Sequence, residues 1–172
     1  MRQDFVFSKV SRKLPFTGAG VLMAHRRHDG SWRVLLFRRA IEPDRGRWSV
    51  VGGRQERGET PAQAALREAV EEAFSGRDPE VFAKKLDGYL PERFDIAACR
   101  SAWIGFPGVF RYRTFLVELT REVPLDVFAL NWESDACRWF PAARLPADAH
   151  FTLPWTVWRL GLTETRPCRT VG

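Results

Sequence analysis

The chain has 172 residues, a length that suits one globular domain and is short for two. Hydrophobic residues make up 45% of it, so the composition excludes a largely disordered chain. No apolar run approaches the roughly 20 residues that span a bilayer, and the apolar segment at residues 5–7 is too short for a signal peptide. We therefore expect a cytoplasmic protein with a single domain over residues 1–172, of which about 163–172 form a loose tail.

The net charge of +6 and the excess of arginine over lysine suit an acidic partner such as a nucleotide or RNA. A charge of this size also serves solubility, and the chain has no long basic run, so RNA is a possible partner but not a favoured one. The cysteines at 99, 137 and 168 show no metal-ligand spacing, which fits a reducing compartment. A homodimer is compatible with the sequence, but no periodic pattern indicates one.

The first elements in chain order are predicted strands. Residues 18–26 and 33–40 flank a polar turn at 28–31 and are typical of a β-hairpin. Residues 47–51 form a short predicted strand, which leads directly into the glycine pair Gly52 and Gly53.

A helix is predicted over residues 61–74. Thr60 is the expected N-cap, Pro61 suits the first helical position, and Gln63 completes a capping box. Phe74 and Ser75 close the segment, and Gly76 is a candidate left-handed residue that ends the helix. The apolar stripe that would dock this helix consists of Ala65, Leu66, Ala69, Val70 and Ala73.

The rest of the chain is predicted to contain three strands, at 81–90, 109–119 and 136–140. Residues 91–108, which carry two prolines and two glycines, are expected to be irregular. A closing helix is predicted over 153–162. Strands and helices in this order indicate an α/β (α+β) fold.

Three carboxylates on the first helix carry the chemistry. Glu68 lies one turn from both Glu71 and Glu72, so the three share one face and repel one another. Arg67 offsets part of this repulsion, and a bound Mg²⁺ would offset more, because it prefers carboxylate oxygens and keeps several waters. The alternative is an acidic helix face that simply contacts water.

The segment resembles the Nudix hydrolase box, which the family writes as G-x5-E-x7-R-E-U-x-E-E-x-G-U, where U is a bulky aliphatic residue. The chain supplies the specified residues at Gly53, Glu59, Arg67, Glu68, Glu71 and Glu72. It departs from the pattern at Ala69, where a larger aliphatic residue is usual, and at Phe74 and Ser75, which replace the closing glycine and aliphatic residue. The departures touch helix packing and termination and leave the carboxylates intact.

The resemblance implies a Nudix-like α/β/α sandwich around a mixed β-sheet. It implies Mg²⁺ as the cofactor, with Mn²⁺ as a possible substitute, held by Gly52, Glu68, Glu71 and Glu72. It also implies that Glu59 pairs with Arg67 to hold the loop against the helix, while Gly52 and Gly53 let the backbone approach the metal.

Catalysis in the family also needs a general base, which differs among its members. The catalytic set implied here is Arg67, Glu71 and Glu72 from the box, together with Glu133 from a loop ahead of the strand at 136–140. Glu133 is the preferred base outside the box, because residues 131–140 resemble a segment that carries a late glutamate in many Nudix enzymes. Asp135, Glu92 and Glu118 are weaker alternatives, and an exposed loop acid is the alternative without function.

Substrate recognition is left to residues outside the box. We expect Trp103 and Phe106 to contact the nucleobase and Arg111 and Arg113 to contact phosphate. The expected reaction is Mg²⁺-dependent hydrolysis of the diphosphate linkage in a nucleoside diphosphate joined to another group, with a nucleoside triphosphate or a related nucleotide as the first guess. An RNA 5′-end pyrophosphohydrolase and a non-catalytic nucleotide-sensing module are the alternatives.

Overall fold

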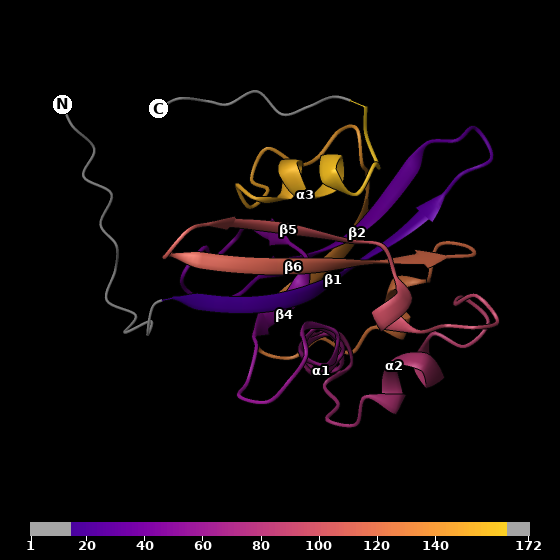
Figure 1. The fold of residues 1–172 in the computed structure, drawn as a ribbon. Coiled ribbons are helices and arrows are strands. Elements are labelled where there is room, and N and C mark those ends of the chain that lie inside the picture. Colours follow the sequence, from indigo (N-terminus) through magenta and orange to yellow (C-terminus); the bar gives the residue numbers. More distant parts are fainter. Residues whose placement is uncertain (1–14, 165–172) are drawn as a thin grey trace.

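The computed structural model describes residues 15–164, so the cysteine at 168 and most of the expected loose tail lie outside the described residues. Seven strands form one sheet with the central order β3-β2-β1-β6-β5. Helices α1 and α2 cover one face and α3 covers the other, which gives three layers (Figure 1). Within residues 15–164, none of the helices is long and apolar enough to cross a bilayer.

The sheet is mixed and is organised around β1 (Phe16–Arg26). One edge of β1 pairs in parallel with β6 (Phe110–Leu119) along ten residues. The other edge is divided: β4 (Val51–Arg54) pairs antiparallel with residues 18–21, and β2 (Trp32–Arg39) pairs antiparallel with residues 23–26. Strands β2 and β4 therefore diverge next to the middle of β1.

The remaining strands extend the sheet on both sides. The two-residue strand β3 (Trp48–Ser49) and the longer β7 (Ser134–Pro141) both pair with β2. Strand β5 (Ser101–Phe106) forms an antiparallel hairpin with β6. The predicted hairpin of β1 and β2 and the mixed sheet are confirmed.

Helix α1 (Pro61–Phe74) has the predicted boundaries and the predicted capping box, in which the Thr60 and Gln63 side chains each accept a backbone N–H of the other residue. Its end differs from the prediction. Ser75, with φ of 48°, is the left-handed residue. Gly76 does not have a positive φ; its N–H donates to the Val70 carbonyl.

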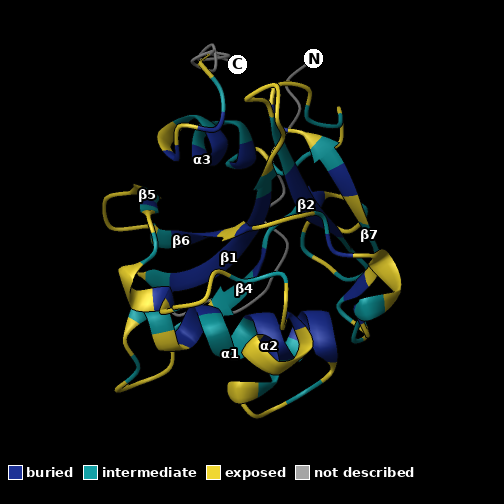
Figure 2. Cartoon of the chain, turned by 90° about the vertical axis from the view of Figure 1, so that its right-hand side faces the viewer, coloured by how far each residue is buried: buried dark blue, intermediate teal, exposed yellow. Residues whose placement is uncertain are grey.

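Two apolar cores lie on the two faces of the sheet. The larger one joins β1, β2 and β6 to α1 and α2 (Glu80–Lys85). The smaller one packs the opposite face of the same strands against α3 (Leu153–Arg159). Figure 2 shows buried residues concentrated along the central strands and the inner face of α1. Side chains alternate between the two cores along each strand, as a sheet covered on both faces requires.

Two predicted elements are wrong. Residues 81–90 contain most of α2 and a turn instead of a strand, because Phe82 and Leu86 are buried on one helical face. The Asp78 side chain accepts the Glu80 N–H just before the helix. The segment 91–108 is not irregular throughout, since it holds the 3₁₀ helix η1 (Ile96–Ala98) and strand β5. A second 3₁₀ helix, η2 (Leu125–Val127), precedes β7, and α3 is shorter than the predicted 153–162.

Candidate functional site

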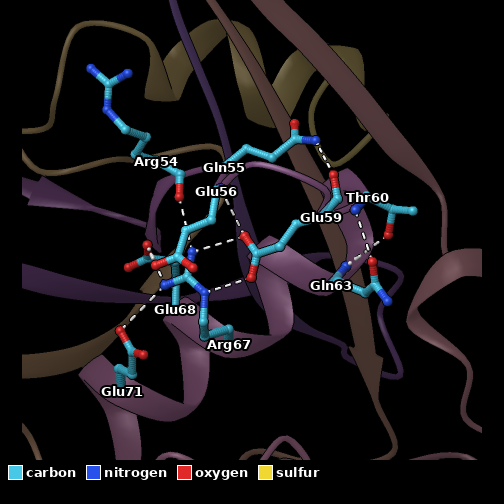
Figure 3. A network of polar contacts seen from close by, with 9 residues as sticks. All are labelled: Arg54, Gln55, Glu56, Glu59, Thr60, Gln63, Arg67, Glu68 and Glu71. Carbon is cyan, nitrogen blue, oxygen red and sulfur yellow. Dashed lines mark hydrogen bonds and ion pairs between the residues drawn. The ribbon is translucent and has the colours of Figure 1, made fainter.

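The loop between β4 and α1 is held by Arg67. Its Nε donates to Glu59 Oε1 at 2.7 Å and its Nη2 donates to Glu59 Oε2 at 3.0 Å, so the guanidinium grips the carboxylate at two points. The same Nη2 donates to the Arg54 carbonyl at 3.0 Å. Figure 3 shows these contacts converging on the first turns of α1. A bidentate arginine–carboxylate pair is geometrically specific, so it sets the position of the loop on the helix.

Glu59 is further anchored by its own loop. The Glu56 N–H donates to Glu59 Oε2 at 2.9 Å, and the Gln55 side-chain amide donates to the Glu59 carbonyl. The hydrogen bond from Arg67 is the main cause that lowers the pKa of Glu59. Glu59 therefore serves to hold the loop against α1.

Arg67 also contacts two of the three helical carboxylates that were expected to bind metal. Its Nη1 lies 2.9 Å from Glu68 Oε1 and 3.4 Å from Glu71 Oε2. Within residues 15–164, no three acidic, histidine or cysteine side chains converge closely enough to hold an ion as they stand. The guanidinium thus supplies the positive charge next to Glu68, and Glu71 remains the more exposed of the two.

Glu72 is the most buried carboxylate of the site, with 5% of its surface exposed. Its Oε1 accepts the Gly52 N–H at 2.9 Å. Burial raises the pKa of Glu72 to about 8; the Gly52 hydrogen bond opposes the shift, and the charges of Glu133 and Glu68 add to it. A buried carboxylate with so little compensation is costly unless a cation binds it.

The glycine pair brings backbone and carboxylates together. A Cβ on Gly53 would lie 2.6 Å from both carboxylate oxygens of Glu68, so any larger residue would displace that carboxylate from its present position. Gly52, with φ of 150°, is the residue whose N–H contacts Glu72. The glycine pair therefore lies directly against the two carboxylates.

The segment that precedes β7 is fastened to the end of α1. The Asn131 N–H donates to the Glu72 carbonyl at 3.1 Å, and the Ala129 N–H donates to the Ala73 carbonyl at 2.9 Å. The Ser75 hydroxyl donates to the Ala129 carbonyl at 2.8 Å. These bonds use carbonyls that the last turn of a helix otherwise leaves without partners.

Aromatic packing supports the same junction. The ring of Phe74 stacks on Phe128 with centroids 5.5 Å apart and meets Phe82 edge-on at 6.0 Å. Phe74 and Ser75 are the two residues that depart from the end of the box, and both contact or pack against the segment at 128–129. The departures thus build the surface on which the next loop rests.

This junction places Glu133 at the box. Its charge raises the pKa of both Glu68 and Glu72, although burial is the larger cause for each of them. Its backbone is fixed by the Asn131 side chain, which accepts the Glu133 N–H at 2.8 Å. The rival Asp135 instead accepts from Arg38 Nε at 2.7 Å.

The other two alternatives lie elsewhere. Glu118 accepts from Arg100 at 2.7 Å, and Glu92 is exposed. Neither is among the groups whose charge acts on Glu68 or Glu72. Of the four late or distant acids, Glu133 is the one that the fold brings to the box.

The donor set fits a divalent cation. Glu68 and Glu72 are held against the backbone of the glycine pair, and the charge of Glu71 acts on Glu68. The charge of Glu133 acts on both Glu68 and Glu72 from the neighbouring loop. Hard oxygen donors of this kind suit Mg²⁺ or Mn²⁺. Binding at Glu68 would compete with its contact to Arg67 Nη1, while the Glu59 contacts use the other two nitrogens of the guanidinium.

The expected substrate residues lie on the β5–β6 hairpin. The guanidinium groups of Arg111 and Arg113 lie 4.8 and 5.5 Å from the ring centroid of Trp103. Phe106, near the hairpin turn, is 58% exposed and packs against Phe110. The charges of these two arginines are not among those that shift Glu68 or Glu72, so the hairpin forms a separate cluster.

The arginine whose charge acts on Glu72 is Arg39, at the end of β2. Its Nε donates to the Pro43 carbonyl at 3.1 Å in the loop that follows. Arg39 falls within the strand predicted at residues 33–40, where the sequence assigned it no role. The signal that was available is its position at the end of a strand, directly before a loop that could return to the site.

Comparison with known proteins agrees with this geometry. The model of the NUDIX domain matches residues 15–158. A Mycobacterium tuberculosis protein named "Putative 8-oxo-dGTP diphosphatase 3" is 42% identical over 59 residues, which are 34% of this chain and 27% of that protein. The chain thus matches about a quarter of the length of this curated relative.

Solved structures show the same fold. The Nudix hydrolase RenU of M. smegmatis has a TM-score of 0.54 and 22% identity, over 85% of this chain and 84% of that one. The C. elegans Ap4A hydrolase in a binary complex has a TM-score of 0.50 and 20% identity, over 74% of this chain and 80% of that one. With the family model spanning most of the described residues, the chain belongs to the NUDIX domain family.

Proposed function

We propose that this protein hydrolyses the diphosphate linkage of a nucleoside diphosphate joined to another group. The observation that carries the proposal is the buried carboxylate of Glu72, held by the Gly52 N–H beside Glu68 and Glu133. Such a concentration of negative charge destabilises the fold unless it serves to bind a cation. Membership of the NUDIX domain family supports the same reaction class.

The cation that we propose is Mg²⁺, with Mn²⁺ as a substitute. Glu68 and Glu72 would hold it, with Glu71 and the Gly52 carbonyl as further donors. Such an ion polarises phosphoryl oxygens and offsets charge on the leaving phosphate. The contact of Arg67 with Glu59 would keep the loop in place if Glu68 left Arg67 Nη1 to bind the ion.

Glu133 is the proposed general base. A base must carry a free carboxylate near the attacking water, and Glu133 has no ion pair among residues 15–164, whereas Asp135 is paired with Arg38. The contacts of residues 129–131 with the last turn of α1 hold Glu133 beside the box. Its task is to accept the proton of the water that attacks phosphorus.

A nucleoside triphosphate or a related nucleotide is the first substrate to test. The names of similar proteins support a panel that includes 8-oxo-dGTP and Ap4A. ADP-ribose, nucleotide sugars and 5′-triphosphate RNA complete the panel. We propose that residues 1–172 form a single domain, with Trp103, Phe106, Arg111 and Arg113 as the more distant substrate contacts.

The test compares the wild-type protein with Glu72→Gln on this panel, with Mg²⁺ and with EDTA. We expect the wild-type protein to cleave a diphosphate linkage only with the metal, detected as new nucleoside phosphates or, from a triphosphate, as pyrophosphate. Glu72→Gln should lose at least a hundredfold in turnover with an unchanged circular dichroism spectrum. Unchanged turnover in Glu72→Gln would refute the assignment. Tight nucleotide binding without any product would favour the non-catalytic sensing module instead.

A further inference from the structure

Tyr112 reaches the site from the neighbouring strand. It lies on β6 in phase with Leu116, so its ring is on the α3 face of the sheet. A Cβ on either Gly20 or Gly52 would collide with the Tyr112 hydroxyl. Since Gly20 and Gly52 are direct partners in the β1–β4 pairing, the side chain crosses β1 and ends over the backbone of the glycine pair.

The Tyr112 side chain can lie here only because Gly20 and its strand partner Gly52 both lack a side chain. Any side chain at either position would occupy the space of the phenol oxygen. The N–H of the same Gly52 donates to Glu72 Oε1. The phenol oxygen and the buried carboxylate thus both lie next to the backbone of Gly52.

The Tyr112 hydroxyl makes no hydrogen bond within residues 15–164, and the residue as a whole is half-buried. Burial and the charges of Glu72 and Glu68 raise the pKa of Tyr112 well above its ordinary value, so the phenol keeps its proton. Arg39 is the positive group that acts on both Tyr112 and Glu72. An unused O–H donor beside a cation site and an arginine is complementary to an anion that accepts hydrogen bonds.

We propose that Tyr112 is a substrate-binding residue, whose hydroxyl donates a hydrogen bond to a phosphate oxygen of the diphosphate bound at the box. This inference rests on the proposed function. It places part of the phosphate subsite on the α3 face of the sheet, at the point where β4 and β2 diverge from β1. The phosphate would then lie between the carboxylate-bound cation, the Arg39 guanidinium and the phenol.

The test uses methylenediphosphonate, a diphosphate analogue that cannot be hydrolysed and has no base. Its affinity in the presence of Mg²⁺ is measured by calorimetry for the wild-type protein, Tyr112→Phe and Tyr89→Phe. Tyr89 is the other tyrosine of the chain, and it lies against Arg121, so its variant is the matched control. Melting temperature and Mn²⁺ affinity by electron paramagnetic resonance are measured on the same proteins.

We expect Tyr112→Phe to bind the analogue about tenfold or more weakly, the usual effect of one hydrogen bond to a charged group. The melting temperature and the affinity for Mn²⁺ should stay the same, because the hydroxyl has no protein partner to lose within residues 15–164. Tyr89→Phe should behave as the wild-type protein does.

Equal affinities of the wild-type protein and Tyr112→Phe for the analogue would overturn the proposal, as would the absence of binding by the wild-type protein at millimolar concentration. A parallel loss of Mn²⁺ affinity would assign the phenol to the cation instead and would also overturn it. If the wild-type protein binds the analogue through Tyr112 but cleaves no nucleotide, the proposed hydrolysis fails and the phosphate subsite stands.

Discussion

The two ends of helix α1 are built in different ways. At its start, the loop is fixed by contacts between residues close in sequence: Arg67 lies eight residues from Glu59 and 13 from Arg54. At its end, Ser75 bonds Ala129, 54 residues away, and Phe74 stacks on Phe128. The start therefore depends on a local pattern, whereas the end depends on the segment between β6 and β7, which is distant in sequence and packs in the same core.

This difference separates two tasks. The start orients Glu68 and the glycine pair, which we propose to hold the cation. The end positions Glu133, which we propose to accept the proton. If the two ends act independently, changes at the start should affect metal binding and changes at the end should affect the proton-transfer step.

The largest expected effect on turnover comes from a change near the C-terminal end of α1. Glu133→Gln should reduce kcat by about 10² to 10⁴, the usual contribution of a general base, and should leave the affinity for Mn²⁺ nearly unchanged. Asp135→Asn is the control, since this neighbouring acid is paired with Arg38. Full turnover in Glu133→Gln would remove the residue from the mechanism.

Arg67→Ala should weaken Mn²⁺ binding and lower kcat/KM by about 10- to 100-fold, as is typical for residues that orient metal ligands. It should also lower the free energy of unfolding by about 1–3 kcal/mol, because Glu59 loses its bidentate partner. Arg67→Lys keeps the positive charge but cannot make the bidentate contact with Glu59. It should therefore recover only part of the metal affinity and part of the free energy of unfolding that Arg67→Ala loses. A variant with normal metal affinity would show that the start of α1 does not organise the cation site.

The smallest expected effect is on the pH dependence of stability without metal. The pKa of Glu72 is raised to about 8 by burial, so the folded state binds a proton more tightly than the unfolded state, whose carboxyl has an ordinary pKa near 4.5. The contribution of the protonated group is fully present below about pH 4.5 and is lost as the pH rises toward 8.

In EDTA, the stability of Glu72→Gln relative to the wild-type protein should therefore increase from pH 5 to pH 8. Chemical denaturation at several pH values measures the difference in free energy of unfolding between the variant and the wild-type protein. At pH 8, Mg²⁺ should reduce this difference, because it would stabilise the ionised carboxylate of the wild-type protein. A constant difference across that range would mean that Glu72 is ionised throughout.

Sequence reasoning succeeded where the determining contacts are local. The boundaries of α1 follow from Thr60, Pro61 and Gln63, which act within one turn. It failed for residues 81–90, where burial of Phe82 and Leu86 on one helical face outweighed a composition that also suits a strand. Strand β5 was missed because its evidence is the pairing with β6, which is not visible in the segment itself.

The site shows the same limit. The box residues could be identified from their offsets, whereas Tyr112 and Arg39 could not, because their relation to the box depends on strands that neighbour one another only in the sheet. The left-handed residue after α1 was assigned to Gly76 on residue preference, but the backbone adopts that conformation at Ser75, whose hydroxyl gains the bond to Ala129.

The bonds from Ala129 and Asn131 to the last carbonyls of α1 also bear on motion. They make the helix and the following loop one cooperative unit, because neither can open without exposing backbone groups of the other. Slow fluctuations that expose the amides of residues 70–73 to exchange should then expose those of residues 129 and 131 at the same rate. The loop at residues 129–133 would then open only when α1 opens. The carboxylate of Glu133 would stay close to the proposed metal ligands for as long as the helix is folded.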